Sequence, residues 1–163
     1  ACVAAGGTQV VSVDGDGGFQ FNIQELATVA TNQLPIKMFV ANNNGYASIR
    51  SSQNGYFQHL VGCDASSGLK LPPLEKLVPA YGVAYEKITA NDDLHAKIAA
   101  VLAAPGPVIC EVVVHPDEVR EPRLSSFKRP DGSMASKPME DLFPFLPRDE
   151  FLSNMLIAPI AED

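Results

Sequence analysis

The chain has 163 residues, of which 46% are hydrophobic and 19% are charged, with 19 acidic against 12 basic side chains. This length suits one domain that buries a core without help from a disulfide or a metal. The net charge of −7 argues against a nucleic-acid partner, because such proteins neutralise phosphates with clustered Lys and Arg. The sequence contains no run of about 18 apolar residues, so we expect no membrane-spanning segment and no membrane partner.

The cysteines and the first residues indicate the compartment. Cys2, Cys63 and Cys110 are odd in number and lack metal-site spacing, which favours a reducing cytoplasm in which each is a small buried side chain. The N-terminal residues carry no basic segment of the kind that begins a signal peptide. Because the chain lacks an initiator Met and a strand-like run follows almost at once, we expect a domain of a longer protein.

The first predicted elements are a strand and a helix joined by glycines. The β-branched run Gln9–Val13 indicates a buried strand, which stops at the glycine-rich segment Gly15–Gly18. Asn22 is a candidate cap for a helix that continues to about Asn32. Glu25 stands three residues after Asn22 and completes the pattern of a capping box.

A second strand and helix follow. Ile36–Ala41 is predicted as a buried strand that ends at the polar turn Asn42–Gly45, and a short helix is expected over Tyr46–Ser52. Residues 53–73 lack periodicity and hold several glycines and a proline pair, so we expect an irregular segment there.

The next residues repeat the alternation, with a helix at Leu74–Tyr81, a strand at Val83–Ile88, a helix capped by Asn91 and a strand at Val108–Val114. Parallel strands need helical crossovers, so the pattern predicts an α/β domain, over residues 1–115, with a doubly wound, mainly parallel sheet and helices on both faces. In such sheets ligands bind beyond the carboxyl ends of the strands, where the glycine-rich and asparagine-rich segments lie.

Residues 116–163 have a different character. Six of the 13 prolines lie between Pro116 and Pro147, and regular hydrophobic spacing is absent until Arg148–Leu156. Apolar side chains are nevertheless frequent near the C-terminus: Phe143, Phe145, Leu146, Phe151, Leu152, Met155 and Leu156. We therefore expect an extended, proline-rich C-terminal arm that packs on its own domain or on a neighbouring subunit.

Two known loop chemistries fit the segment Asp14–Phe19 poorly. A dinucleotide-binding fingerprint needs a third glycine where Gln20 stands, and an acid between its first two glycines would repel a pyrophosphate unless a cation intervened. An EF-hand that begins at Asp14 needs glycine at the sixth position, where Phe19 stands, and Gly18 supplies no side-chain oxygen at the fifth.

A Mg²⁺ site explains the same residues better. Asp16 follows one strand and Asn43 follows the next, so neighbouring parallel strands would bring both side-chain oxygens to one edge of the sheet. With a free carbonyl in the turn Asn44-Gly45, they would form half of an octahedral Mg²⁺ shell, which water and phosphate oxygens usually complete. The amides of Gly17 and Gly18 would then face anionic oxygens, so the expected ligand is a diphosphate held through Mg²⁺.

These residues also resemble a known family. Gly15-Asp16-Gly17, followed after 24 residues by Asn42-Asn43, is similar to the thiamine-diphosphate motif of the acetolactate synthase and pyruvate decarboxylase superfamily. The flanking segments Gly18–Thr28 and Leu34–Lys37 look like that family too. The resemblance covers essentially residues 1–114, and it implies the C-terminal, diphosphate-binding domain of a three-domain enzyme.

The resemblance implies a role for each matching residue. Asp16 and Asn43 would ligate Mg²⁺ through their side chains, and Gly45 would ligate it through its carbonyl. The residues implied to contact the cofactor are Gly15, Asp16, Gly17, Gly18, Asn43, Gly45, Tyr46, Ala47 and Ser48. Gly18 departs from the serine that the family often has there, which removes a hydroxyl contact and leaves the backbone amide.

The resemblance also implies the chemistry. A 2-keto acid such as pyruvate would be decarboxylated, and the resulting acyl carbanion equivalent would pass to an acceptor. In the family, a glutamate from the N-terminal domain of a neighbouring subunit activates the cofactor, and no residue of this chain matches its motif. We therefore expect no catalytic residue in this chain, partners in the N-terminal domains and a second subunit of a homodimer or tetramer, and no activity from the chain in isolation.

Several alternatives remain open at this point. One is simple decarboxylation of the keto acid with proton transfer. Another, of a different class, is a non-catalytic module that binds a Mg²⁺-diphosphate and regulates a partner; a natural start codon at this boundary would favour it. Val61–Cys63, Ser67–Leu69, Leu124–Ser126 and Asp141–Leu146 resemble acetolactate synthase-like proteins of surface-polysaccharide and branched-sugar biosynthesis.

Overall fold

The computed structural model describes residues 1–159 and divides the chain into two compact units, Ala1–Glu118 and Val119–Asp163. The helices and strands of the first unit are β1 (Val10–Gly15), α1 (Asp16–Gln20), η1 (Ile23–Glu25), α2 (Leu26–Thr31), β2 (Ile36–Asn42), α3 (Ala47–Tyr56), η2 (Ala65–Ser67), α4 (Leu74–Ala80), β3 (Ala84–Ile88), α5 (Leu94–Ala103) and β4 (Val108–Val113). Within residues 1–159, no helix is both long enough and apolar enough to cross a membrane.

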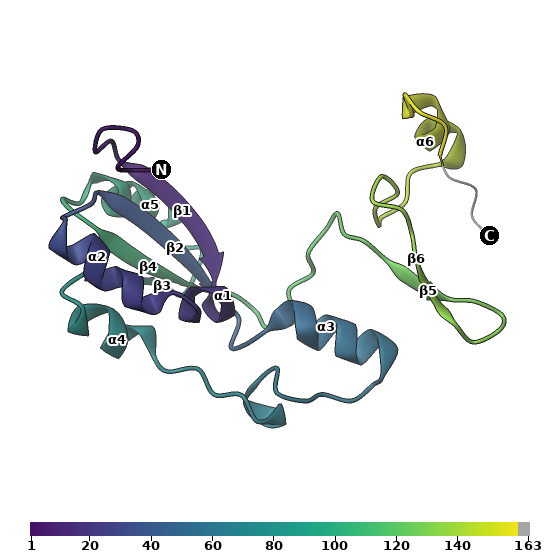
Figure 1. Cartoon of the computed structure of the whole chain (residues 1–163), viewed down its shortest axis with the longest axis horizontal. Coiled ribbons are helices and arrows are strands. Elements are labelled where there is room, and N and C mark those ends of the chain that lie inside the picture. Colours follow the sequence, from purple (N-terminus) through teal and green to yellow (C-terminus); the bar gives the residue numbers. More distant parts are fainter. Residues whose placement is uncertain (160–163) are drawn as a thin grey trace. The chain divides into compact units, whose positions relative to one another are not determined.

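The first unit is built on a four-stranded sheet in the order β1-β2-β4-β3, with every neighbouring pair parallel (Figure 1). Its strands coincide closely with the four runs predicted from hydrophobic periodicity, and helices connect them because parallel strands cannot be joined by tight turns. The prediction that the first strand is buried is wrong, because β1 is an edge strand that leaves Val11 and Val13 exposed. The segment predicted to be irregular from residue 53 begins later, since α3 continues to Tyr56. The register pairs Gly15 with Ala41, so the ends of β1 and β2 lie next to each other. The predicted α/β fold is confirmed.

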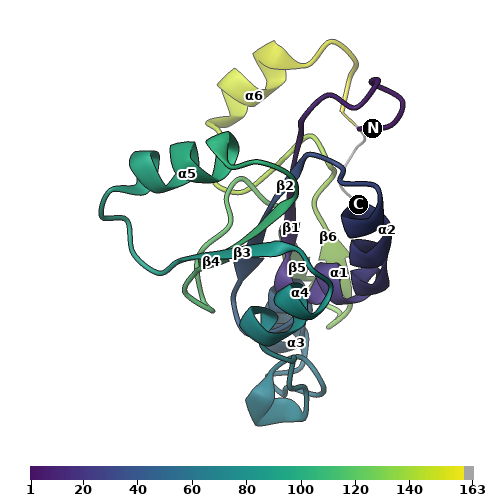
Figure 2. The same cartoon turned by 90° about the vertical axis from the view of Figure 1, so that its left-hand side faces the viewer.

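Helices cover both faces of this sheet, because successive residues of each strand face opposite sides. In β4, Ile109 belongs to a core cluster with Leu26 of α2 and Val78 of α4. The neighbouring Cys110 belongs to a second cluster with Val101 of α5. Figure 2 shows α2 and α5 on opposite sides of the sheet. The sheet is therefore the middle layer of three.

Two predicted helix starts are wrong. The Asn22 side chain makes no capping hydrogen bond, and a 3-10 turn separates it from α2, while the Glu25 carboxylate accepts from the Thr28 hydroxyl at 2.9 Å. The Asn91 side chain does not cap α5 either, because that helix begins after Asp93, whose φ is +54°. In both places a tight backbone turn satisfies the first amides, so the cap preference of asparagine is not used.

Lys37 is a fully buried cation in the middle of the sheet, with 0% of its surface exposed. Its ammonium donates to the carbonyl of Ala104 at 2.6 Å and to the carbonyl of Gly106, just beyond the end of α5. Burial lowers the pKa of this amine below its usual value, so the two carbonyl acceptors compensate a costly placement. Lys37 thus ties β2 to the carboxyl end of α5.

We expect Lys37→Ala to lower the free energy of unfolding by about 2–4 kcal/mol, because it leaves a cavity and two carbonyls without their donor. Chemical denaturation of the variant would measure this loss. Lys76→Ala, which removes an exposed lysine from α4, is the matched control and is expected to change stability by less than about 0.5 kcal/mol. Equal stability of the two variants would contradict the assigned role of Lys37.

The second unit holds a short antiparallel hairpin of β5 (Ser126–Lys128) and β6 (Met134–Ser136), followed by α6 (Arg148–Asn154). Its centre is Asp141, which is 2% exposed and receives hydrogen bonds from the Arg148 guanidinium at 2.8 and 2.9 Å. The predicted C-terminal arm therefore has internal structure of its own. Its packing on the first unit or on a neighbouring subunit stays a prediction.

Candidate metal and diphosphate site

The candidate site forms where β1 and β2 end side by side. β1 continues directly into α1, whose first residue is Asp16, and β2 ends at Asn42, after which the chain turns through Asn43 and Asn44. The Asp16 side chain is buried, with 3% of the residue exposed. The structure thus brings together the two loops that the sequence singled out, at the edge of the sheet where they were expected.

Asp16 joins the two loops through hydrogen bonds. Its Oδ1 accepts from the amide of Gly17 at 2.9 Å, and its Oδ2 accepts from the amide of Gly45 at 2.9 Å. Burial raises the pKa of this carboxyl above its usual value of 3.8, and amides of the turn oppose that shift. Within residues 1–159, no ion pair joins Asp16 to a cationic side chain. A bound metal ion would stabilise such a buried carboxylate.

The side chain of Asn43 contains an unsatisfied hydrogen-bond acceptor. Its Oδ1 is buried and has no hydrogen-bond partner among residues 1–159. Buried polar atoms are nearly always paired, so an orphaned oxygen in the turn that also hydrogen-bonds to the buried Asp16 carboxylate is a candidate for a ligand contact. Amide and carboxylate oxygens suit Mg²⁺, and therefore the residues present fit the metal that the sequence predicts.

Gly45 lies in a position that only glycine can occupy. Its φ is +142°, and a Cβ there would stand 2.2 Å from the carbonyl oxygen of Cys63. The neighbouring amide of Tyr46 donates to the same carbonyl at 2.8 Å, and Gly45 bridges to Asp64. The segment that returns after α3 thus supports the turn from behind. The Gly45 carbonyl accepts from the Ala47 amide at 3.2 Å, which leaves its second lone pair for a metal.

The remaining predicted residues surround this centre. Gly15 ends β1, Gly17 and Gly18 lie in the first turn of α1, and Tyr46 precedes Ala47 and Ser48 at the start of α3; a Cβ on Gly17 would stand 2.3 Å from the Tyr46 ring. The absence of that Cβ lets the two helix starts approach each other. The Gly17 amide donates to Asp16 here, and the predicted contacts with a diphosphate stay predictions.

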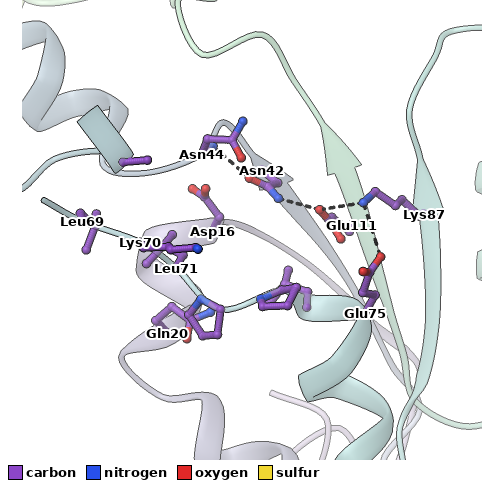
Figure 3. A pocket seen from close by; sticks show the side chains of 14 residues that line it. Asp16, Gln20, Asn42, Asn44, Leu69, Lys70, Leu71, Glu75, Lys87 and Glu111 are labelled. Atoms are coloured by element: carbon purple, nitrogen blue, oxygen red, sulfur yellow. Dashed lines mark hydrogen bonds and ion pairs between the residues drawn. The ribbon is translucent and has the colours of Figure 1, made fainter. Parts of the chain in front are cut away.

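A cavity of about 560 Å³ opens beside Asp16, and its lining includes Gln20, Asn44, Lys70 and Lys87 (Figure 3). The Nε2 atom of Gln20 is buried and has no partner within residues 1–159, so it is a donor ready for a ligand oxygen. Gln20 was not predicted as a site residue. The sequence did carry a signal, because positions 16 and 20 of a helix share one face.

Other metal chemistries find less support. In the part of the chain that the structure describes, no three His, Cys, Asp or Glu side chains gather into a metal cluster. Burial raises the pKa of the Cys110 thiol to about 11, so this cysteine is a poor ligand and a poor nucleophile at neutral pH. The candidate centre therefore depends on one carboxylate and on neutral oxygens.

The fold and the site define a three-layer α/β domain that carries candidate metal-ligating oxygens at the ends of its strands. Residues 1–112 match the family model described as the thiamine pyrophosphate enzyme, C-terminal TPP binding domain. The chain belongs to this family, as the resemblance implied.

Relatives of this chain include acetolactate synthase large subunits, which agrees with the family assignment. The acetolactate synthase large subunit of Parasynechococcus marenigrum is 34% identical over 119 residues, which cover 72% of this chain and 19% of that protein. The corresponding subunit of Cyanidium caldarium is 30% identical over 120 residues, 73% of this chain and 20% of that protein. The chain thus spans about a fifth of the length of these relatives.

Among solved structures, the thiamine diphosphate-dependent 4-hydroxybenzoylformate decarboxylase of Rhodococcus jostii is similar to this chain. Its TM-score is 0.61 at 25% sequence identity, and the match covers 72% of this chain and 22% of that chain. This similarity supports the α/β fold. Thiamine diphosphate as the cofactor is supported by the family model.

Proposed function

We propose that this chain is the cofactor-binding part of a cytoplasmic, acetolactate synthase-like enzyme that uses thiamine diphosphate and Mg²⁺. The enzyme decarboxylates a 2-keto acid such as pyruvate and transfers the acyl carbanion equivalent to an acceptor. The proposal rests on two observations at the ends of adjacent strands: the Asp16 carboxylate is buried at the end of β1, and the Asn43 side-chain oxygen, just after β2, is buried without a hydrogen-bond partner within residues 1–159.

The proposed roles of the residues are those that the family resemblance implies. Asp16, Asn43 and the Gly45 carbonyl would hold Mg²⁺, which neutralises the diphosphate and fixes its position. The start of α3, from Tyr46 to Ser48, would form one wall of the cofactor site. Thiamine diphosphate, when bound, supplies the electron sink for a carbanion next to a carbonyl. This chain then binds and orients, while a glutamate in the N-terminal domain of a neighbouring subunit completes the active site of a dimer or tetramer.

Two narrower assignments extend the proposal. The similarity to the Rhodococcus decarboxylase favours simple decarboxylation as the second candidate reaction. The sequence resemblance of the segments around Cys63, Ser125 and Asp141 favours a role in polysaccharide or branched-sugar biosynthesis. A non-catalytic Mg²⁺-diphosphate module is the candidate of another class.

The deciding experiment compares the 163-residue chain with the complete enzyme. Carbon dioxide release from pyruvate and related keto acids is measured with thiamine diphosphate and Mg²⁺ present. We expect turnover by the complete enzyme and none by the chain, because the residues that activate the cofactor lie elsewhere. Product analysis separates a condensation product from the aldehyde of simple decarboxylation. Turnover by the purified chain that survives chelation controls would overturn the assignment of roles.

A further inference from the structure

Asn42 has a role different from that of its neighbour Asn43. Its side-chain Oδ1 accepts from the amide of Asn44 at 2.9 Å, while its Nδ2 donates to the carboxylate of Glu111 at 2.6 Å. Asn44 has a φ of +61°, a left-handed turn conformation that asparagine adopts more readily than other non-glycine residues. Asn42 thus fixes the turn that presents the candidate metal ligands, and it is itself held from β4.

Glu111 is a carboxylate placed in a core position of β4, with 4% of the residue exposed. The register pairs it with Val40, and Asn42 lies two residues after Val40 on the same face of the sheet. Tyr85 of β3 donates its hydroxyl to the second carboxylate oxygen. The Lys87 ammonium lies 3.6 Å from the first carboxylate oxygen, as Figure 3 shows. Burying a charged carboxylate costs free energy, so a functional role for Glu111 at this position is worth testing.

The carboxylate of Glu111 can fix the orientation of the Asn42 side-chain amide. An ionised carboxylate accepts hydrogen bonds and donates none, so Glu111 selects the amino end of the Asn42 amide. The oxygen of the same amide is then directed toward Asn44. A neutral hydroxyl at position 111 could pair with either end of the Asn42 amide. The amide could then adopt two orientations, and only one of them directs its oxygen toward Asn44.

We propose that Glu111 is a positioning residue for the metal site, and that it acts through Asn42 to hold the turn Asn43–Gly45 in its ligating conformation. This inference rests on the proposed function, because it assumes that the turn binds Mg²⁺. Residues that orient metal ligands through hydrogen bonds usually contribute about 10–100-fold to metal affinity. Glu111 touches neither metal nor substrate and is not assigned a step in the reaction.

The test uses the complete enzyme with Mn²⁺ as the probe. Electron paramagnetic resonance measures the concentration of unbound Mn²⁺, from which the Kd is obtained. Glu111→Leu preserves the bulk of the side chain but removes the acceptor, and we expect the Mn²⁺ Kd to rise by about tenfold or more. Glu111→Gln can still accept from Asn42 through its amide oxygen, but its amino group can also donate, so it is expected to restore only part of the affinity that Glu111→Leu loses. Tyr85→Phe, the matched control, removes a partner of the other carboxylate oxygen and is expected to shift the Kd by less than about threefold.

A double-mutant cycle separates positioning through Asn42 from a general loss of structure. If Glu111 acts through Asn42, Glu111→Gln restores binding only while Asn42 is present, and Asn42→Ala combined with Glu111→Leu binds Mn²⁺ no worse than the weaker single variant. Additive losses would overturn the inference, as would a wild-type Kd in a folded Glu111→Leu variant.

A second measurement covers the case in which Glu111→Leu fails to fold. Hydrogen exchange at the Asn44 amide of metal-free enzyme is expected to be faster in Asn42→Ala than in Tyr85→Phe, and equal rates would overturn the inference. The outcomes for the metal itself stay distinct. Wild-type enzyme that binds no Mn²⁺ would overturn the proposed metal site together with this inference. Binding that is lost in Asp16→Ala but unchanged in both Glu111→Leu and Asn42→Ala would overturn the positioning role alone.

Discussion

Asp16→Asn is expected to abolish Mg²⁺-dependent cofactor binding while the metal-free protein stays folded. Replacing residues that only orient metal ligands costs about 10–100-fold in affinity, so the loss of the single charged ligand is expected to cost at least about 100-fold. Asparagine has nearly the same shape as aspartate and keeps one acceptor for the Gly17 or Gly45 amide. Calorimetric titration of the complete enzyme with thiamine diphosphate and Mg²⁺ would measure the loss.

The direction in which Asp16→Asn changes the stability of the metal-free protein can also be predicted. The pKa of Asp16 is raised by burial, so its ionised form is disfavoured in the metal-free fold. The part of the stability that depends on this group is fully present below the usual pKa of 3.8 and is lost as the pH rises through the raised value. At neutral pH, Asp16→Asn is therefore expected to be at least as stable as wild type without metal, and wild-type metal affinity is expected to fall as acid protonates Asp16.

A neighbouring acid provides the control for these measurements. Asp14 is exposed and accepts a hydrogen bond from the Gly15 amide at 2.8 Å. Asp14→Asn removes the same charge two residues away and is expected to leave Mg²⁺-dependent binding near wild type. A Kd that rises equally in both variants would indicate a general effect of negative charge and would remove Asp16 from the metal shell.

The sheet and the place of the site could be predicted because they depend on local patterns and one general rule. Buried parallel strands read as short apolar runs, and the ends of adjacent parallel strands meet at one edge. From these two facts, Asp16 and Asn43 could be expected to lie together, and the structure places both there. The roles of the two residues as metal ligands stay predictions.

The supports of the site could not be predicted, since they come from segments that local patterns do not place. Residues 53–73 read as irregular, yet Cys63 and Asp64 return to hold Gly45 from behind. Glu111 reads as a single polar residue in an apolar strand, and its contact with Asn42 depends on the register of β2 against β4. Long-range register and loop return are tertiary properties, which composition and periodicity do not record.

The helix starts show the opposite case, in which a local preference was present but tertiary structure overrode it. Asn22 and Asn91 have the side chains that helix caps favour. A 3-10 turn after Asn22 and a left-handed residue before Leu94 satisfy the first amides through the backbone instead. Cap propensity contributes about 1 kcal/mol, which is small beside the packing of α2 and α5 on the sheet.

Gly45→Ala is expected to destabilise the fold and to distort the site, because alanine does not tolerate the backbone conformation there and its Cβ would clash with a neighbouring atom. A φ of +142° is close to inaccessible for alanine and costs about 1–3 kcal/mol. The new Cβ would also stand 2.2 Å from the Cys63 carbonyl, which is backbone and cannot rotate away. The turn must then move, and Asn43 and the Gly45 carbonyl would move with it. We expect a lower melting temperature and Mg²⁺-dependent binding that is weaker by at least about tenfold.

Gly55→Ala is the matched variant for this last prediction. Gly55 lies in α3, and a Cβ there would meet nothing within 4 Å, so alanine is expected to raise stability by up to about 1 kcal/mol through its better helix propensity. Thermal denaturation of both variants and titration with Mg²⁺ and thiamine diphosphate would compare them. If Gly45→Ala bound the cofactor as tightly as Gly55→Ala does, the Gly45 carbonyl could not be a ligand held by this turn. The metal would then have to be coordinated from Asp16 and Asn43 without it.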